Sequence, residues 1–214
     1  MILRRDALMG IVAALAVLTA SWATGATLAA FSDTTNNPGN SFSAAASFCS
    51  NPGTQTLIAD ADAYVDENAA LSNYGASSSL HVQSRAGGRN RRTLVHFPAP
   101  AGLFCTVTSA TLRLWATSAD GGRTLQVYEL ATVWTEGTVT WATQPLAIGT
   151  PSTVISAAGW VQFDVTAQAQ SLFGSLNTGL LVKDSMEDQN PPRTQQFSSR
   201  EAGAYPPELT ITQA

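Results

Sequence analysis

TLRLWA, at residues 111–116, is the stretch that decides the fold class of this chain of 214 residues. Apolar and polar side chains alternate in it, with Leu112 and Leu114 at one parity and Arg113 and Trp115 at the other. Successive side chains of a strand point to opposite faces of its sheet. The period of two therefore predicts a β-strand with one face in the core and a polar, aromatic-bearing face on the other side.

The same signature recurs on both sides of this stretch. Residues 160–165, for example, place Val161 and Phe163 opposite Trp160 and Gln162. We expect one short helix at 166–173 and strands at 57–65, 80–84, 93–97, 110–117, 124–130, 139–141, 153–155, 160–165, 179–183, 195–198 and 208–212. Many short strands separated by turn residues predict a single all-β domain, built as a sandwich or a barrel of antiparallel strands.

The N-terminus has the order of a secretory signal peptide, residues 1–29. Two arginines precede an apolar run at 7–22, and small residues lead to a cleavage site between Ala29 and Ala30. A membrane-spanning helix needs about 20 apolar residues, so the alternative, an uncleaved anchor, fits less well. We expect a secreted or cell-surface protein that has no membrane attachment after cleavage.

Two cysteines follow the signal peptide. Residues 30–56 have the composition of a linker, with the domain at 57–214, and Cys49 and Cys105 lie one in each part. In an oxidising compartment we expect them to pair. The bridge closes a loop of about 57 residues and is worth about 4 kcal/mol in the chain-entropy model. Free thiols are one alternative. Another is that the two cysteines bind a metal ion together, but zinc needs further ligands.

Charge and motif content exclude several classes of function. The net charge is −4, and removal of the leader, whose Arg4, Arg5 and Asp6 sum to +1, leaves −5. A nucleic-acid binder carries a basic surface instead. The sequence has no G-x-S-x-G elbow, no H-E-x-x-H and no Gly-rich phosphate loop, and its two histidines, His81 and His96, lie outside ligand motifs. We expect a protein that is not an enzyme.

An ordered set of motifs spans residues 57–212. They are ADAYV (61–65), NYG (73–75), LHV (80–82), RRTLVHF (91–97), SATLRL (109–114), WTEGTVTW (134–141), WVQFDVT (160–166) and FSSRE (197–201). The set resembles the DNRLRE domain, a family that overlaps carbohydrate-binding module family 96. The resemblance implies a jelly-roll β-sandwich and a non-catalytic module of secreted polysaccharide-active or cell-surface proteins. Some members bind acidic polysaccharides such as alginate.

A second resemblance concerns the leader. AAFSDT (29–34) and NSFSA (40–44) are similar to the signal-peptide boundary of SipW-dependent envelope and biofilm-matrix precursors, although Ala45-Ala46 stand where that pattern has a glycine. The resemblance implies a dedicated signal peptidase. It also implies an alternative function, a structural envelope or matrix protein that assembles through protein contacts.

The densest basic cluster comprises Arg85, Arg89, Arg91 and Arg92, with Gly87-Gly88 between them. The glycines predict a hairpin loop before the next strand. Guanidinium groups suit carboxylate or sulfate recognition, so the cluster is a candidate site for anionic sugars. The alternative is a solvated loop in which an arginine pairs with an acidic residue.

Aromatic side chains are further glycan candidates. Trp115, Tyr128 and Trp160 lie on the polar faces of their strands, where flat rings could stack on pyranoses; the alternative is burial. For Arg200 a structural ion pair is the first choice and ligand contact the second. Because Arg200 and Glu201 are adjacent on an expected strand, they should point to opposite faces and pair with different partners.

Asp62, Asp66 and Asn73 are candidate calcium ligands. Asp62 and Asp66 share a parity on an extended strand, and calcium takes several oxygen ligands. The alternative, carboxylates that cap turns, has the greater weight. No other cofactor is expected. The sequence thus predicts a secreted, non-catalytic module that binds polysaccharide, with acidic glycans favoured.

Overall fold

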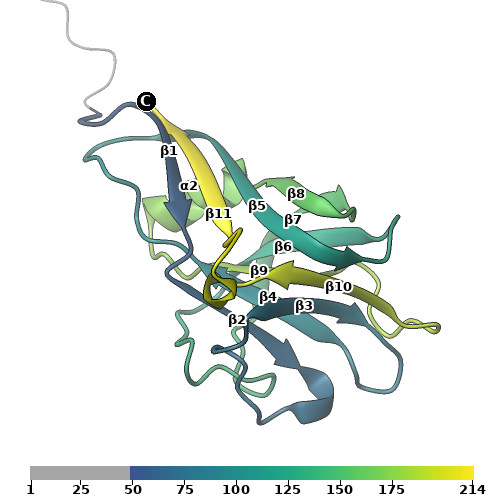
Figure 1. Cartoon of the computed structure of the whole chain (residues 1–214). Coiled ribbons are helices and arrows are strands. Elements are labelled where there is room, and N and C mark those ends of the chain that lie inside the picture. The colour runs from purple at the N-terminus through teal and green to yellow at the C-terminus, as the bar shows by residue number, and fades with distance from the viewer. Residues whose placement is uncertain (1–48) are drawn as a thin grey trace, which may run out of the picture. The chain divides into compact units, whose positions relative to one another are not determined.

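A computed structural model describes residues 49–214, which form eleven strands, one α-helix and two 3-10 helices (Figure 1). The strands are β1 (Gly53–Ile58), β2 (Ala61–Asp66), β3 (Ser79–Ser84), β4 (Arg91–His96), β5 (Val107–Ala119), β6 (Thr124–Leu130), β7 (Ala147–Ile155), β8 (Gly159–Asp164), β9 (Leu180–Asp184), β10 (Arg193–Ser198) and β11 (Glu208–Gln213). The helices are η1 (Glu67–Ala69), α2 (Thr166–Gly174) and η2 (Arg200–Ala202).

All strand pairings within the described residues are antiparallel. The sheet runs in the order β1-β11-β5-β10-β3-β4-β9-β6-β7, with β2 added to β4 and β8 added to β5. The sheet is strongly curled, like half of a barrel. The predicted all-β domain of antiparallel strands is therefore confirmed, whereas the two-sheet jelly roll stays a prediction.

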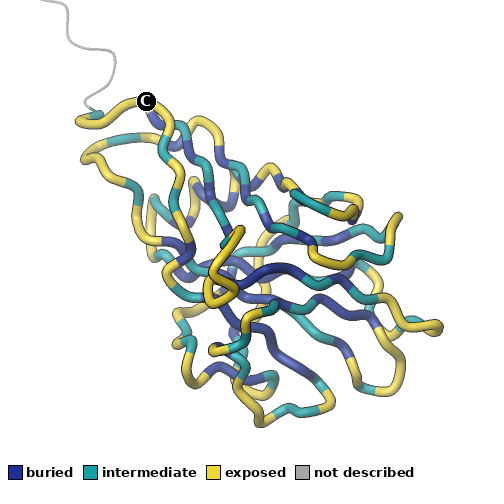
Figure 2. The backbone as a smooth tube through the Cα atoms, viewed as in Figure 1, coloured by how far each residue is buried: buried dark blue, intermediate teal, exposed yellow. Residues whose placement is uncertain are grey.

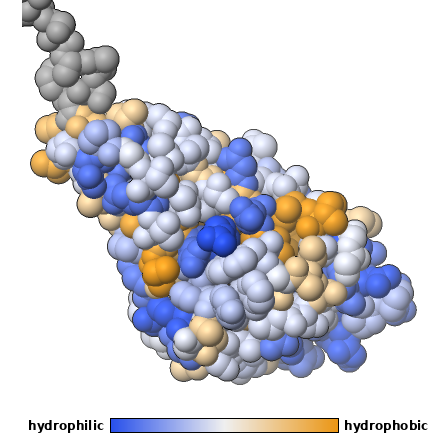
Figure 3. All heavy atoms as spheres, turned by 45° about the horizontal axis from the view of Figure 1, so that its top comes forward, coloured by the Kyte–Doolittle hydropathy of each residue, from blue (hydrophilic) through white to orange (hydrophobic). Residues whose placement is uncertain are grey.

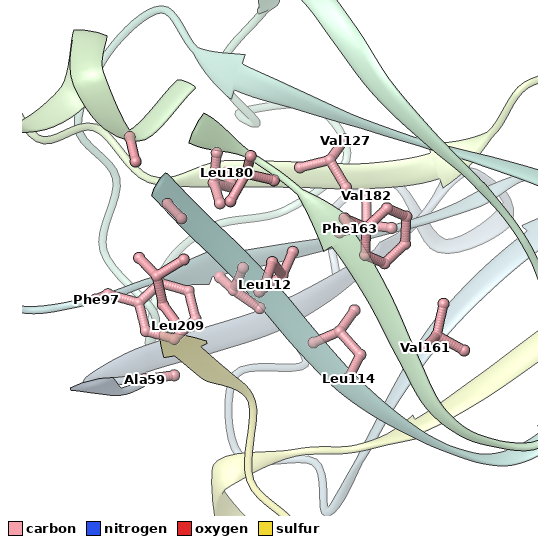
Figure 4. Close-up of a cluster of buried hydrophobic side chains, with 14 of the residues drawn as sticks. Ala59, Phe97, Leu112, Leu114, Val127, Val161, Phe163, Leu180, Val182 and Leu209 are labelled. Carbon is pink, nitrogen blue, oxygen red and sulfur yellow. The ribbon is translucent and has the colours of Figure 1, made fainter. Parts of the chain in front are cut away.

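The core lies inside the curl. Strand β5 carries the TLRLWA stretch, and its Leu112 and Leu114 are fully buried as the alternation predicts. In the register of β8 they face Phe163 and Val161, and Figure 4 shows these side chains gathered with others from β9 and β6. Each such side chain contributes about 1.5–3 kcal/mol when it leaves water.

A second, smaller core covers the opposite side of β4. Leu94 belongs to this cluster, together with Ala63, Val65 and Leu181, whereas the adjacent Val95 faces the main core. Strand β4 is thus buried on both faces at its centre, where three consecutive residues are buried (Figure 2). Trp134 and Trp141 pack against the second cluster.

Three sequence predictions need correction. The expected strand 57–65 is two strands, since the chain bends at Ala59-Asp60 and moves from β11, the partner of β1, to β4, the partner of β2. The expected strand 139–141 is wrong: this segment is a loop that buries Val139. Strand β1 also begins at Gly53, inside the predicted linker 30–56.

Two other predictions are confirmed. Helix α2 covers the expected 166–173, and Cys49 and Cys105 form a disulfide with a Cα–Cα distance of 4.2 Å. The signal peptide 1–29, its cleavage site and residues 30–48 lie outside the described residues. None of the helices in residues 49–214 has the length and hydropathy needed to cross a membrane.

Candidate functional site

The basic cluster lies, as expected, on the loop from β3 to β4. Gly87 and Gly88 have φ of 81° and 69°, values that glycine adopts without strain. Asn90 is 3% exposed and fixes the loop: its Oδ1 accepts from the amides of Arg85 (3.1 Å) and Asp188 (3.0 Å). The loop therefore has a defined shape, and sequence reasoning missed the asparagine that defines it.

A polar cavity of about 270 Å³ opens beside this loop. Its lining residues are Asp66, Asn68, Gln83, Arg85, Arg89 and Arg91. Arg85 and Arg89 are exposed and form no salt bridge with any residue in 49–214. Arg193 resembles them in both respects. The β10–β3 register pairs it with Ser84, the residue before Arg85, and it is not one of the residues that line the cavity. In Figure 3 the molecule is strongly hydrophilic at this end, on the right of the view.

The other two arginines of the cluster have structural partners. Arg91 donates through Nε to Asp66 at 2.7 Å. Arg92 donates to both carboxylate oxygens of Glu187, at 2.7 and 2.8 Å, and lies 4.5 Å from the ring centre of Trp141. Burial opposes ionisation of Glu187, but the hydrogen bonds and charge of Arg92 lower its pKa overall. A direct glycan role for Arg91 and Arg92 stays a prediction.

The Arg92–Glu187 ion pair is expected to contribute to the free energy of unfolding. We expect Glu187→Gln to lower the free energy of unfolding by about 2 kcal/mol at pH 7, because charge-assisted hydrogen bonds are lost. Since the folded-state pKa lies below the unfolded one, this contribution is present above about pH 4.5 and is lost as the pH falls through the folded-state value. Urea unfolding at pH 7 and pH 3.5 measures it.

The control is Glu129→Gln, which removes a carboxylate that has no salt bridge within residues 49–214. Equal midpoints for the two variants at pH 7, or a Glu187→Gln deficit that persists undiminished at pH 3.5, would contradict the assignment.

The structure brings two of the three predicted aromatic candidates together. Trp115 and Trp160 are register partners with ring centres 5.4 Å apart. Tyr205 stacks on Trp115 at 4.4 Å, and the guanidinium of Arg113 lies 4.2 Å from the ring centre of Trp160. Both tryptophans thus have protein partners, and Tyr205, half exposed, is the outer ring. Nothing in the sequence pattern indicated Tyr205, which lies in the loop before β11.

Tyr128 lies elsewhere. It is on β6, which pairs with β7 and β9 and not with β5 or β8. Its ring packs against the second core, with Lys183 Nζ 6.0 Å from the ring centre. Tyr128 therefore belongs to a different surface from Trp115 and Trp160.

A pair of tyrosines that the sequence reasoning did not select lies near the arginine cavity. Tyr64 and Tyr74 stack with centres 4.3 Å apart, and His81 contacts Tyr64 edge-on at 4.7 Å. Arg91 lies 5.8 Å from the Tyr64 ring centre and connects this pair to the cavity. Burial first, and then the charge of Arg91, lower the pKa of His81, so this imidazole is neutral at pH 7.

Asp62 is the only one of the three calcium candidates that lies in an acidic cluster. One carboxylate oxygen from each of Asp62, Glu136 and Glu201 lies within 4.8 Å of the others. Asp66 instead caps η1 through the amide of Asn68 at 2.9 Å and pairs with Arg91. Asn73 donates to the carbonyl oxygens of Glu136 and Val139, both at 2.7 Å. Asp66 and Asn73 thus follow the turn-capping alternative.

Arg200 lies beside the acidic cluster. Its Nη2 donates to Glu136 at 2.7 Å and to Glu201 at 2.9 Å, so the expected structural ion pair is present. The expectation that Arg200 and Glu201 would not pair with each other is wrong, because both lie in η2 rather than on a strand. Burial first, and then the charges of Glu201 and Glu136, raise the pKa of Asp62 to about 7.

The described domain is all-β and carries a polar cavity, two exposed arginines in its lining and a half-exposed tyrosine beside two tryptophans. The model of carbohydrate-binding module family 96 matches residues 53–213, from the first residue of β1 to the last of β11, and the chain belongs to this family. It is therefore a non-catalytic carbohydrate-binding module. No curated protein matches the chain.

Proposed function

We propose that the protein is a secreted module that binds acidic polysaccharide through Arg85, Arg89 and Arg193. One observation carries the proposal. Within residues 49–214 these are the cationic side chains without a salt bridge, whereas the remaining arginines and Lys183 all have acidic partners. Three guanidinium groups without a salt bridge, two of which line a polar cavity, are an arrangement suited to carboxylates of a polymer.

The chemistry of the cavity fits a uronic-acid chain. Guanidinium groups bind carboxylates, and the exposed amide of Asn68 supplies donors and an acceptor for sugar hydroxyls. The amide of Gln83 already donates to the carbonyl oxygen of Arg89 at 2.7 Å and holds the loop. The whole chain has a net charge of −4, so a polyanion is repelled elsewhere on the surface. We therefore assign both the position and the selectivity of binding to the three arginines that have no salt bridge. Arg91, Arg92, Arg200, Trp115, Tyr128 and Trp160 remain candidate secondary contacts.

Export to the cell surface or medium is part of the proposal. The signal-peptide pattern at 1–29 supports it, and so does the Cys49–Cys105 disulfide, since such bonds persist in oxidising compartments. The family likeness also supports a jelly-roll arrangement of the curled sheet, with polysaccharide of an envelope or of the environment as the partner.

Electrophoresis of the purified protein through gels that contain polysaccharide tests the binding. We expect alginate and polygalacturonate to retard migration and neutral dextran to leave it unchanged, with the retardation reduced at high salt by screening. Retardation by dextran but not by the acidic polymers, or unchanged migration in every gel, would overturn the proposal.

The alternative function, a self-assembling matrix protein, predicts that the particle mass measured by light scattering rises with protein concentration. A glycan-binding module predicts a constant mass.

A further inference from the structure

Three carboxylates from distant parts of the chain meet at one point of the described domain. Asp62 is on β2, Glu136 is in the loop between β6 and β7, and Glu201 is in η2. One oxygen from each lies within 4.8 Å of the others. The loop of Glu136 is held against β2 by the amide of Asp62, which donates to Glu136 Oε1 at 2.8 Å. The fold therefore builds the cluster, rather than an acidic run in the sequence.

The cluster contains a buried carboxylate oxygen without a hydrogen-bond donor. Asp62 is 0% exposed, and its Oδ1 has no partner, whereas Oδ2 accepts from the amide of Arg200 at 2.7 Å. A buried polar atom in this state is costly unless something pairs with it. Asp62 contributes one of the three oxygens that converge, and its Oδ1 is the carboxylate oxygen that no hydrogen-bond donor of the described residues reaches.

The single guanidinium nearby does not balance the cluster. Arg200 Nη2 reaches Glu136 and Glu201, but its contact with Asp62 is through the backbone amide. Three carboxylates beside one arginine leave two excess negative charges when all are ionised. The raised pKa of Asp62 has the same origin, since desolvation is its largest cause and the two glutamate charges add to it.

The donor set and its spacing favour calcium. Carboxylate oxygens are hard ligands, and Ca²⁺ binds them at about 2.3–2.6 Å, so two ligands of one ion are at most about 5 Å apart. The cluster falls within this limit. Mg²⁺ at about 2.0–2.1 Å holds ligands at most about 4 Å apart and demands octahedral geometry. Glu201 and Arg200 are exposed, so solvent can supply the remaining ligands.

We propose that Asp62, Glu136 and Glu201 form a calcium site in which the ion pairs with the oxygen of Asp62 that Arg200 does not reach. The ion joins β2, the β6–β7 loop and η2, which are three separate segments of the chain. Calcium thus fixes the loops on this side of the domain. This role is independent of the proposed glycan site at Arg85, Arg89 and Arg193.

Thermal unfolding of the EDTA-treated protein, titrated with CaCl₂ or MgCl₂ at constant ionic strength and pH 8, tests the site without any glycan. We expect CaCl₂ to raise Tm saturably, by about 5–10 °C at a hundredfold excess over Kd, and MgCl₂ to have a smaller effect. Isothermal titration calorimetry should show one calcium site. Asp62→Asn and the exposed Glu201→Gln should both lose the response, and Glu129→Gln should keep it.

Two results would overturn the site. The first is the absence of a calcium-dependent shift of Tm in the unaltered protein. If Asp62→Asn then has a higher Tm, Asp62 holds a proton shared with Glu201 in place of an ion. The second is an equal calcium shift in the protein, in Glu201→Gln and in Asp62→Asn, which would place the ion elsewhere. Because glycan binding is absent from these measurements, neither result bears on the proposed function.

Discussion

Replacing Arg85 and Arg89 together by alanine is expected to weaken the binding of an acidic polysaccharide by about 100-fold. Each guanidinium can make charge-assisted hydrogen bonds worth about 1.5–3 kcal/mol, and the loss of two such partners exceeds the 2.7 kcal/mol that a 100-fold change requires. Both side chains are exposed and have no protein partner to leave unpaired. The melting temperature should therefore stay unchanged, and affinity electrophoresis in alginate gels gives the change in Kd.

A charge-preserving variant separates recognition from simple attraction. The double variant Arg85→Lys with Arg89→Lys keeps the net charge but replaces planar guanidinium groups, which bind carboxylates in a bidentate way, by ammonium groups. We therefore expect an intermediate loss of affinity, about tenfold. Wild-type affinity in the double alanine variant would contradict the assignment of the site. Equal losses in the lysine and alanine variants would leave the site in place and show that fork geometry dominates over charge.

Replacing Cys49 and Cys105 together by serine is expected to lower the free energy of unfolding by about 4 kcal/mol. The disulfide joins residues 56 apart in sequence, and a closed loop of this length removes much conformational entropy from the unfolded chain. Strand β1, at the edge of the sheet, begins only four residues after Cys49. Urea unfolding at pH 7 measures the loss as a shift of the midpoint.

The unaltered protein in reducing agent is the matched control. Its midpoint should fall to that of the serine variant, and the reductant should leave the variant itself unchanged. Equal midpoints for the oxidised protein and the serine variant would show that the bridge does not constrain the unfolded chain.

Strands with one buried face could be predicted from the sequence, and other segments could not. The alternation of TLRLWA gave the correct faces of β5, because Leu112 and Leu114 point into the core and Arg113 and Trp115 away from it. Strand β2 is buried along nearly its whole length, so its pattern has no period of two and merged with β1 into one predicted strand. The segment 139–141 has strand-like composition, but it packs as a loop over the second core.

Part of the candidate site could likewise be predicted from the sequence, and part could not. The arginine loop could be found because Arg85, Arg89 and the two glycines are close in sequence. Arg193 could not, since only the β10–β3 register reveals that it pairs with Ser84, the residue before Arg85. The acidic cluster is also formed by segments far apart in the chain. The sequence indicated Asp62 because it lies on the same side of an extended strand as Asp66, but the structure places it beside Glu136 and Glu201.

The most direct test of the central claim is calorimetric titration of the purified protein with one oligogalacturonate and with the fully methyl-esterified form of the same oligosaccharide. The two ligands share rings, linkages and length and differ in the carboxyl group, which the methyl ester makes neutral. Binding through Arg85, Arg89 and Arg193 predicts saturable heat for the acid, weakened by added salt, and at least tenfold lower affinity for the ester. Equal affinity for the two forms, or binding of the ester alone, would contradict it.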